Sequence, residues 1–287
     1  MHNLTGIKEV KNLLARHGFT FSKAMGQNFI INPAVCPRMA KESGCEGIGV
    51  IEIGPGIGVL TAELARLARR VVCIELDTRL APILQETLSG IDNVSVVFED
   101  VLKVDLAALI AREFVGMEVV VCANLPYYIT SPIVMALLEK QLPVKAITVM
   151  VQKEAAQRLC AQPGTRDVGA VSIAVRYYSE PKVLFQVSRG SFLPAPEVDS
   201  SVIRLDVRDT PPVAVQDAAL FFAVVRAAFS QRRKTVSNSL AGVRGLAKEQ
   251  VKLVLQQAEV PANARAEQLT LAQFAAIADS ACTTTKT

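Results

Sequence analysis

The sequence is poor in several residue types that commonly carry chemistry. Its 287 residues include two histidines, His2 and His17, and no tryptophan. Histidine-based metal sites and catalytic triads need more histidine than this, or a histidine placed among other reactive residues. The sequence therefore predicts no metal site, and any reaction must depend on other side chains or on the main chain.

The six cysteines do not have the spacing of a metal site either. None forms a CxxC pair, and Cys73 and Cys122 lie within apolar runs that are typical of buried strands. We interpret them as reduced core residues of a cytosolic protein. The start, MHNLTGIKEV, lacks the apolar core of a signal peptide, and no run reaches the roughly 18 apolar residues of a membrane span. We expect a cytoplasmic protein without a membrane partner.

Acidic residues are scarce in one C-terminal stretch. Residues 226–252 hold seven bases, including Arg232, Arg233 and Lys234, against the single acid Glu249, a local charge of +6 in a chain of net charge +4. A solvated helix face would explain such a run. A local positive patch on a nearly neutral body is also typical of a protein that binds a polyanion.

The first two thirds of the chain alternate apolar runs with helical patterns. Strands are predicted at 49–53, 71–76, 94–100, 118–124 and 146–152. Each of these runs is followed by a segment with helical periodicity. Continuous apolar, β-branched strands joined by helices favour an α/β fold with a parallel sheet covered on both faces.

The pattern changes after Gly169. Two further strands are predicted at 172–178 and 200–207, as an antiparallel extension of the sheet. The prolines of DTPPVAV, 209–215, indicate a linker. Helical patterns follow at 216–230, 232–241, 247–258 and 270–281. We predict an α/β domain over 1–207 and a small all-helical domain over 208–287 that carries the basic patch.

Three glycines mark the turn after the first strand of the predicted sheet. Gly54, Gly56 and Gly58 form a GxGxG pattern, which lets the backbone approach a ligand closely at a helix N-terminus. The pattern differs from the GxGxxG fingerprint of dinucleotide binding. NAD and S-adenosylmethionine both present an adenosine, but this spacing, with Glu52 two residues before the first glycine, favours the methyl donor.

Acidic residues mark the ends of the next two strands. Glu75 follows the glycine turn by about 20 residues, where an acid accepts the ribose hydroxyls of an adenosine. Glu99 and Asp100 end the third strand, and Asp100 is placed to meet the adenine amino group. An N-cap or turn role explains either acid singly. Glycine, acid and acid on three successive strand ends together predict a cofactor site.

The fourth strand ends in Asn124-Leu125-Pro126-Tyr127-Tyr128, at the same edge of the sheet. If the acceptor is the exocyclic amine of adenine, its lone pair is delocalised into the ring, and the site must accept hydrogen bonds from the N–H groups. The Asn124 side-chain oxygen and a main-chain carbonyl of Leu125 or Pro126 suit this task. Pro126 restrains these carbonyls. Tyr127 offers a face on which the base stacks, and Tyr128 is expected in the core.

Several motifs together resemble one known family. They are GQNFI (26–30), EIGPGIGVLT (52–61), ED (99–100), NLPY (124–127), VQKEAAQRL (151–159), FLPAPEVDSSV (192–202) and FSQRRKTVSNSL (229–240). The chain resembles the ribosomal RNA adenine dimethyltransferases over nearly its whole length, most closely the bacterial type that acts on small-subunit RNA. The resemblance implies a Rossmann-like class I methyltransferase sheet.

The resemblance also implies an activity, a substrate and a cofactor site. The activity is the transfer of two methyl groups from S-adenosylmethionine to each of two adjacent adenines near the 3′ end of 16S rRNA, within an assembling small ribosomal subunit. A monomer is expected. The implied cofactor contacts are Asn28, Ile30, Gly54, Glu75, Asp100 and Asn124, and we add Gly56 from the glycine turn.

The segment FLPAPEVDSS suits a base-binding role. Pro194 and Pro196 stiffen an extended loop that is expected to carry Phe192 toward the base, opposite Tyr127. We assign RNA binding to Arg232, Arg233 and Lys234. The chain departs from the family pattern in GTRDVG, 164–169, where Val168 replaces an expected aromatic residue, which puts the contribution of that loop to RNA binding in doubt.

Other functions remain open at this point. A large-subunit RNA methylase of the macrolide-resistance type shares the core motifs, but the RRKT-containing helical tail and the FLPAPEVDSS loop favour the small-subunit type. A DNA adenine methylase more often has an acid at the Asn124 position. A release-factor glutamine methylase needs a proline in place of Leu125. A non-catalytic RNA-binding relative has no use for Asn124, Tyr127 and Glu75.

Overall fold

A computed structural model of the protein describes residues 4–22, 25–231 and 233–284. The chain folds into two compact units. The first contains residues 1–156 and 181–207, and the second contains 157–180 and 208–287. The segment 157–180, which we expected in the first domain, therefore belongs to the second unit. The chain enters the second unit, returns to complete the sheet, and leaves again.

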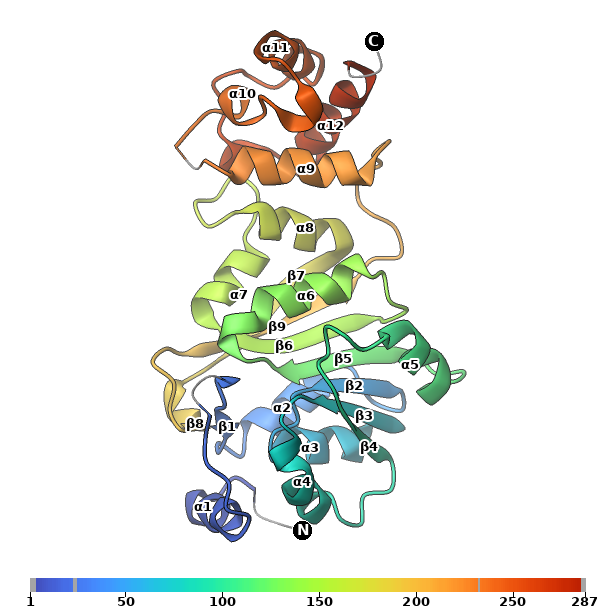
Figure 1. Ribbon diagram of the computed structural model, residues 1–287, viewed down its shortest axis with the longest axis vertical. Coiled ribbons are helices and arrows are strands. Elements are labelled where there is room, and N and C mark those ends of the chain that lie inside the picture. The colour runs from blue at the N-terminus through green and yellow to red at the C-terminus, as the bar shows by residue number, and fades with distance from the viewer. Residues whose placement is uncertain (1–3, 23–24, 232, 285–287) are drawn as a thin grey trace. The chain divides into compact units, whose positions relative to one another are not determined.

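A seven-stranded sheet organises the first unit, in the order β4-β3-β2-β5-β6-β9-β7 (Figure 1). The five predicted strands are present and parallel to one another. They are β2 (Gly49–Ile53), β3 (Arg70–Glu75), β4 (Val94–Phe98), β5 (Val119–Asn124) and β6 (Ala146–Gln152). β9 (Ser200–Val207) runs antiparallel to β6, as expected for this segment.

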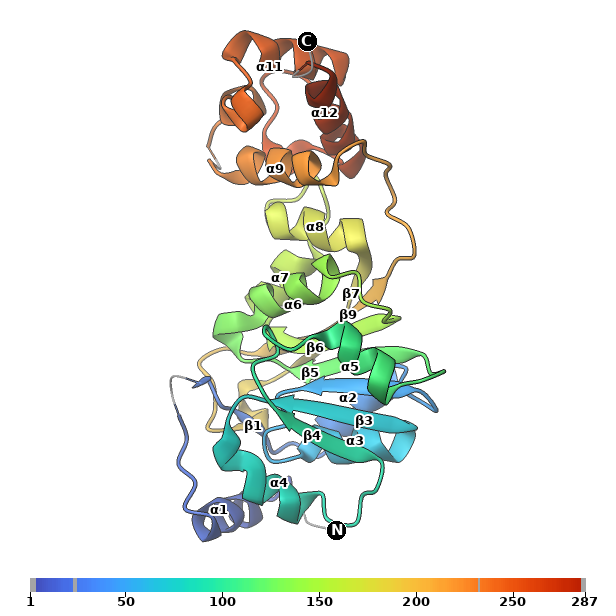
Figure 2. The same cartoon turned by 45° about the vertical axis from the view of Figure 1, so that its right-hand side comes forward.

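Helices between the strands complete this unit. They are α1 (Ile7–Arg16), α2 (Val35–Glu42), α3 (Val59–Leu67), α4 (Ala81–Thr87), α5 (Leu106–Glu113), α6 (Thr130–Glu139) and the start of α7 (Lys153–Cys160). The predicted core cysteines Cys73 and Cys122 are fully buried in β3 and β5. α1 lies beside α4, where Arg16 and His17 both bond the Glu86 carboxylate (Figure 2). Within the described residues, no helix combines the length and apolar character that a bilayer span requires.

The strand predicted at 172–178 is wrong. The segment forms helix α8 (Ala170–Tyr178), which begins where the Gly169 N–H donates to the Ser172 hydroxyl. Its β-branched residues favour a strand, but burial of Ile173 and Tyr177 on one helical face outweighs that local preference. The strand beside β9 is instead β7 (Ser179–Val187). It contains Pro181, which is tolerated because this strand lies at the sheet edge.

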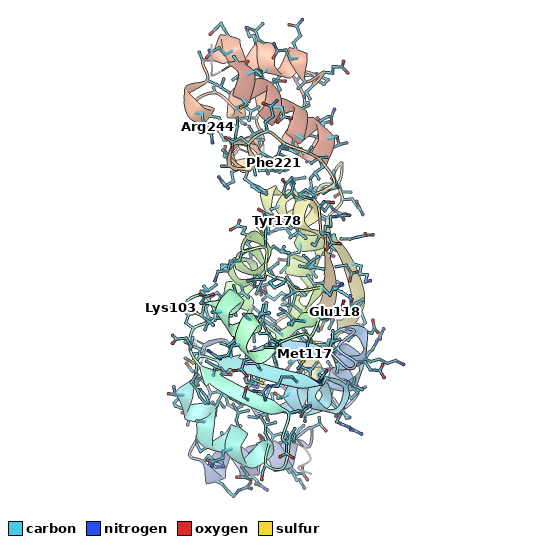
Figure 3. The ribbon with its side chains drawn as sticks, turned by 90° about the vertical axis from the view of Figure 1, so that its right-hand side faces the viewer. Lys103, Met117, Glu118, Tyr178, Phe221 and Arg244 are labelled. Carbon is cyan, nitrogen blue, oxygen red and sulfur yellow. The ribbon has the colours of Figure 1, made fainter. Side chains whose placement is uncertain are left out.

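The rest of the second unit is helical. It contains α9 (Ala218–Phe229), α10 (Val236–Ser239), α11 (Lys248–Gln257) and α12 (Leu271–Thr284). Aromatic rings join α8 to α9, since Tyr177 lies 5.0 Å from Phe221 and Tyr178 stacks on Phe222 at 5.5 Å between centroids. Figure 3 shows Tyr178 and Phe221 on these neighbouring helices. Val168 is buried in the same core, so it contributes to packing.

The strand order reverses between β2 and β5, which are neighbours in the sheet but not in the sequence. Open α/β sheets bind ligands at such a point, outside the carboxyl ends of the strands. Ile53 pairs with Ala123, so the next residues, Gly54 just beyond β2 and Asn124 at the end of β5, stand side by side at this edge. A small two-stranded sheet of β1 (Phe29–Ile30) and β8 (Phe192–Leu193) completes this unit.

Candidate active site

A cleft opens at the carboxyl ends of β2, β3 and β5. It encloses about 830 Å³ of empty space, part of it open to solvent, within the size range of small-molecule sites. The predicted site residues that line this cleft are Asn28, Ile30, Gly54, Gly56, Glu75, Asn124, Leu125, Pro126 and Tyr127. Residues far apart in the sequence thus meet in one cavity, because parallel strands end at the same edge of the sheet.

The glycine turn forms the floor of this cleft. Gly54 and Gly56 have φ of +72° and +59°, a backbone region that side chains disfavour. A Cβ on Gly56 would also stand 3.2 Å from the Phe29 ring. The turn therefore brings bare backbone to the cleft, and its Gly56 N–H points to the Glu75 carboxylate at 3.3 Å.

Glu75 is held in one orientation at the end of β3. Its side chain is 7% exposed, and its Oε1 accepts the Asp77 N–H at 2.8 Å. Burial raises the pKa of Glu75, while the N–H groups of Asp77 and Gly56 act in the opposite direction. A fixed carboxylate on the wall of an apolar cleft is a suitable acceptor for paired hydroxyl groups such as those of a ribose.

Glu52 lies deeper, beneath the same cleft. Its carboxyl is fully buried, and Cys73 Sγ donates to its Oε2 at 3.4 Å. Burial raises the pKa of Glu52 from its ordinary value of 4.5 to about 7, against the hydrogen bonds from Thr61 and Cys73 that lower it. Glu52 therefore titrates near neutral pH at a position that lines the cleft.

Glu52 should make the stability of the first unit depend on pH. Because its pKa is higher in the folded than in the unfolded protein, its contribution is fully present below pH 4.5 and is lost as the pH rises through about 7. Glu52→Gln should remove this dependence. In thermal melting from pH 4 to 9, the melting temperature of Glu52→Gln should rise relative to that of the wild type as the pH rises. Glu46→Gln, which changes an exposed side chain, is the control. Parallel curves would contradict the assignment.

Asn124 occupies the end of β5 with its amide already oriented. Its Nδ2 donates to the main-chain carbonyl of Asn28 at 3.2 Å. Among the described residues, its Oδ1 has no hydrogen-bond partner. The Leu125 N–H is bonded to the Met150 carbonyl at 3.2 Å, which ties the following residue to β6. The amide oxygen of Asn124 is therefore available to accept a hydrogen bond in the cleft.

The structure distinguishes the carbonyls of Leu125 and Pro126, either of which could accept from the amine on the sequence alone. The Pro126 carbonyl accepts the Ile129 N–H and the Thr130 hydroxyl, both at 3.2 Å, at the start of α6. The Leu125 carbonyl has no such partner in the described part of the chain. Leu125 is thus the better placed of the two to accept from a ligand in the cleft.

The two tyrosines after Pro126 differ in their surroundings. Tyr127 is half-buried, and its hydroxyl shares a 2.7 Å hydrogen bond with Ser200 Oγ on β9. Burial raises the pKa of Tyr127. Tyr128, which we expected in the core, is 60% exposed, so that prediction is wrong. It lines the cleft, and its ring lies against Gly26.

An N-terminal segment closes one side of the cleft. Residues 25–30 all line it, and β1 at the end of this segment pairs with β8. Reasoning from the residues alone did not find Asn28 and Ile30, because GQNFI reads as an ordinary loop before a helix. They were predicted only through the family resemblance, and the structure places both at the cleft.

Two of the predicted catalytic and cofactor-binding residues, Asp100 and Phe192, are not among those that line the cleft. Asp100 lies just beyond β4, where its carboxylate accepts the Leu102 N–H at 3.0 Å. Phe192 is 2% exposed and packs in the core of this unit, opposite Ile30 in the β1–β8 pair. The structure therefore does not show Phe192 facing Tyr127 across the cleft, because strand pairing buries this residue.

The second unit contains a separate basic cavity. Arg166, Arg233 and Arg265 line it together with the acid Glu267. Lys234 is exposed beside Arg233, whereas Arg232 lies outside the described residues. Part of the predicted patch is neutralised, because Arg244 donates to Asp217 at 2.7 Å.

Metal-binding groups do not gather anywhere in the part of the chain that the structure describes. No cluster of three or more His, Cys, Asp or Glu side chains suited to a metal ion occurs there. All six cysteines are reduced thiols, and five of them are buried. Burial raises the pKa of the Cys160 thiol, which is partly buried, to about 11.

The strand order, the glycine turn, the acid at the end of β3 and the Asn-Leu-Pro-Tyr end of β5 define a class I methyltransferase, whose methyl donor is S-adenosylmethionine. The residues present fit this donor, since a buried carboxylate and a free amide oxygen face one apolar cleft. The chain belongs to the ribosomal RNA adenine dimethylase family, which it matches over residues 18–282.

Relatives and solved structures agree with this membership. Ribosomal RNA small subunit methyltransferase A of Geobacillus thermodenitrificans is 49% identical over 277 residues, 94% of each chain. The protein of the same name from Alkaliphilus oremlandii is 46% identical over 282 residues, 98% of each chain. The 23S rRNA methyltransferase ErmE is 28% identical with a TM-score of 0.67, covering 88% of this chain and 99% of its own. A dimethyladenosine transferase from Plasmodium falciparum, 24% identical with a TM-score of 0.73 over 86% of this chain and 95% of its own, shares the fold.

Proposed function

We propose that this enzyme transfers methyl groups from S-adenosylmethionine to the exocyclic N6 of two adjacent adenosines near the 3′ end of 16S rRNA, during assembly of the small ribosomal subunit. The observation that carries the proposal is Asn124-Leu125-Pro126-Tyr127 at the end of β5, beside Gly54 and in the same cleft as Glu75. Relatives named for small-subunit methylation match nearly the full length of the chain.

The Asn124 amide and the Leu125 carbonyl prepare the acceptor amine. Both oxygens accept from N–H groups, so an amine held between them gives up its planar geometry and turns its lone pair toward the donor side of the cleft. The bound donor supplies an electrophilic methyl group. No strong base is required before attack, because the amine proton becomes acidic once the nitrogen carries positive charge. Holding both reactants in line provides much of the acceleration.

Tyr127 should act mainly through its ring. Tyr127→Phe keeps the stacking face and loses only the bond to Ser200, so kcat/KM for RNA should fall by no more than about fivefold. Tyr127→Ala removes the ring, and the loss of about 1–3 kcal/mol of stacking should lower kcat/KM by roughly 5- to 150-fold. Steady-state kinetics of both variants tests this. Equal losses in the two variants would assign the role to the hydroxyl.

RNA binding is proposed for the basic residues of the second unit. Arg233 and Lys234 are exposed, and Arg233 shares a cavity with Arg166 and Arg265. Guanidinium groups gathered in one cavity suit the phosphate oxygens of a folded RNA. We include Arg232 from its sequence position. Action in the cytoplasm, as a monomer, completes the proposal, and six reduced thiols suit a reducing compartment.

The large-subunit alternative has weaker support. The 23S rRNA methyltransferase ErmE is 28% identical to this chain, against 44–49% for the small-subunit relatives. A non-catalytic RNA binder would have no use for an oriented amide and a buried carboxylate in one cleft. These two observations favour a catalyst that acts on small-subunit RNA.

One experiment tests the whole proposal. The protein is incubated with labelled methyl donor and unmethylated small-subunit particles, and the RNA is digested to nucleosides. N6,N6-dimethyladenosine at two neighbouring positions of 16S rRNA is expected, and naked 16S rRNA in parallel shows whether the particle is needed. Label in 23S rRNA only would favour the alternative. No transfer to any RNA would contradict the enzymatic proposal.

A further inference from the structure

Gln27 makes three hydrogen bonds at the edge of the cleft, the longest of them from Nε2 to Met25 Sδ at 3.8 Å. Its Nε2 donates to Asp77 Oδ2 at 2.7 Å, and its Oε1 accepts the Ser22 N–H at 3.1 Å. Both ends of the amide are thus engaged by the protein. Gln27 lines the cleft, but its side chain bonds Ser22 in the preceding part of the chain and Asp77 just beyond β3. These bonds indicate that Gln27 fixes the N-terminal segment in place.

Asp77, the partner of Gln27, is itself firmly held. It is buried and receives the Arg79 guanidinium through Nε at 2.8 Å and Nη2 at 2.7 Å, and also the Arg79 N–H at 3.1 Å. The hydrogen bonds from Arg79 and Gln27 lower the pKa of Asp77. Arg79 in turn covers the Phe19 ring at 5.1 Å. Gln27 is therefore bonded to an ionised acceptor whose position is set by several other contacts.

The Gln27–Asp77 bond lies between the two ends of the site. On one side, the Asp77 N–H is the 2.8 Å donor that orients the Glu75 carboxylate. On the other side, Asn28 follows Gln27 directly, and its carbonyl accepts the Asn124 amide at 3.2 Å. A shift of the backbone at Gln27 would move the Asn28 carbonyl and release the amide of Asn124.

The orientation of that amide matters for the reaction. With Nδ2 on the Asn28 carbonyl, the Asn124 oxygen is free to accept from an amine. If the amide turned over, its NH₂ would face the NH₂ of the acceptor, donor against donor. No other described contact of the Asn124 side chain distinguishes the two orientations.

We infer that Gln27 is a positioning residue for methyl transfer: its hydrogen bond to Asp77 holds the Asn28 carbonyl where it fixes the Asn124 amide with the oxygen toward the acceptor. The inference rests on the proposed function and extends it to a residue that does not touch the reacting atoms. Gln27 therefore affects the rate of the chemical step more than the affinity for RNA.

The two partners allow a reciprocal exchange. Gln27→Glu places a carboxylate against Asp77 and should slow single-turnover methyl transfer by about 10- to 100-fold, the size of effect that small displacements of a reacting group produce. Asp77→Asn alone should have a smaller effect, because the remaining side-chain oxygen can still accept from Gln27 Nε2 and Arg79 Nη2, although Arg79 Nε loses its acceptor. Gln27→Glu with Asp77→Asn restores one donor and one acceptor and should return the rate to within about fivefold of the wild type.

Donor affinity and a spectroscopic signal separate positioning from general damage. At saturating concentrations of donor and RNA, methyl transfer by Gln27→Glu should stay slow, which excludes weak donor binding as the cause. Its RNA affinity should be within a few-fold of the wild type. The side-chain ¹⁵N–¹H resonances of Asn124, assigned by their loss in Asn124→Asp, should shift in Gln27→Glu and return in the double variant.

The outcomes are decisive in either direction. A double variant as slow as Gln27→Glu, or a Gln27→Glu rate within twofold of the wild type, would overturn the inference. If the wild type itself transfers no methyl group, the proposed function fails. The Asn124 resonances then decide separately, since unchanged resonances in Gln27→Glu reject the positioning role and shifted ones support it.

Discussion

Replacing Asn124 by alanine should lower the rate of methyl transfer by about 10²- to 10³-fold while donor affinity stays within a few-fold of the wild type. The side-chain oxygen is one of two acceptors available to the amine, and loss of one such oriented group typically lowers kcat by about 10²- to 10³-fold. The donor keeps Glu75 and the glycine turn, and the N-terminal segment that lines the cleft loses only the bond from Asn124 to the Asn28 carbonyl. Single-turnover rates and equilibrium donor binding measure the two quantities separately.

Asn124→Asp provides the matched control. The carboxylate keeps an oxygen toward the acceptor but loses the donor that bonds the Asn28 carbonyl at 3.2 Å. If the oxygen is what matters, this variant should retain more activity than alanine, and still less than the wild type. Turnover of Asn124→Ala near the wild-type rate would refute the mechanism, and a large loss of donor binding would move Asn124 from acceptor activation to cofactor retention.

The site residues on strand ends were predictable because of a property of parallel sheets. Parallel strands that alternate with helices end at one edge of the sheet. The proximity of Gly54, Glu75 and Asn124 could therefore be predicted without knowledge of their contacts. The reversal of strand order between β2 and β5 then selects the position along that edge. Local pattern was sufficient here, since each of these residues directly follows or ends a strand.

The residues contributed by loops were not predictable in this way. Gln27 bonds a partner 50 positions away, and Phe29 and Ile30 pair with residues more than 160 positions along the chain. No periodicity marks such contacts, because a two-residue strand has too few residues to show alternation. The burial of Phe192 follows from the same pairing, and the extended loop predicted from its prolines gave no indication of it.

The error at α8 has a different cause. Val171, Ile173 and Val175 favour a strand locally, but the segment packs against α9 in the second unit, where a helical face is required. The boundary at 207 missed the same excursion, since the sequence changes little in composition on entering 157–180. Composition identifies the linker at 209–215 by its two prolines. It gives no sign that the chain leaves the first unit at 157 and returns to it at 181.

Replacing Arg232, Arg233 and Lys234 together by glutamine should weaken RNA binding by about 10- to 100-fold at low salt and flatten its salt dependence. Each phosphate that a cation neutralises contributes roughly 0.7–0.9 to the slope of log K against log salt, so removing three such cations should change the slope by about 2. Arg233 and Lys234 are exposed and bear no ion pair in the described structure, unlike Arg244. Filter binding or fluorescence anisotropy from 50 to 300 mM salt measures both quantities, and melting of the free variant confirms that it folds.

A pair of equal charge separates a phosphate site from a general field. Lys248 and Lys252 lie exposed on α11 in the same unit, and their double glutamine variant loses the same charge as Arg233→Gln with Lys234→Gln. If the basic residues act only by long-range attraction, both double variants should lose the same RNA affinity. This attraction is screened over a Debye length of about 10 Å at 0.1 M salt. If Arg233 and Lys234 bind phosphate directly, only their replacement should weaken RNA binding and flatten its salt dependence. Equal effects of the two pairs would reduce the proposed RNA site to a positively charged surface.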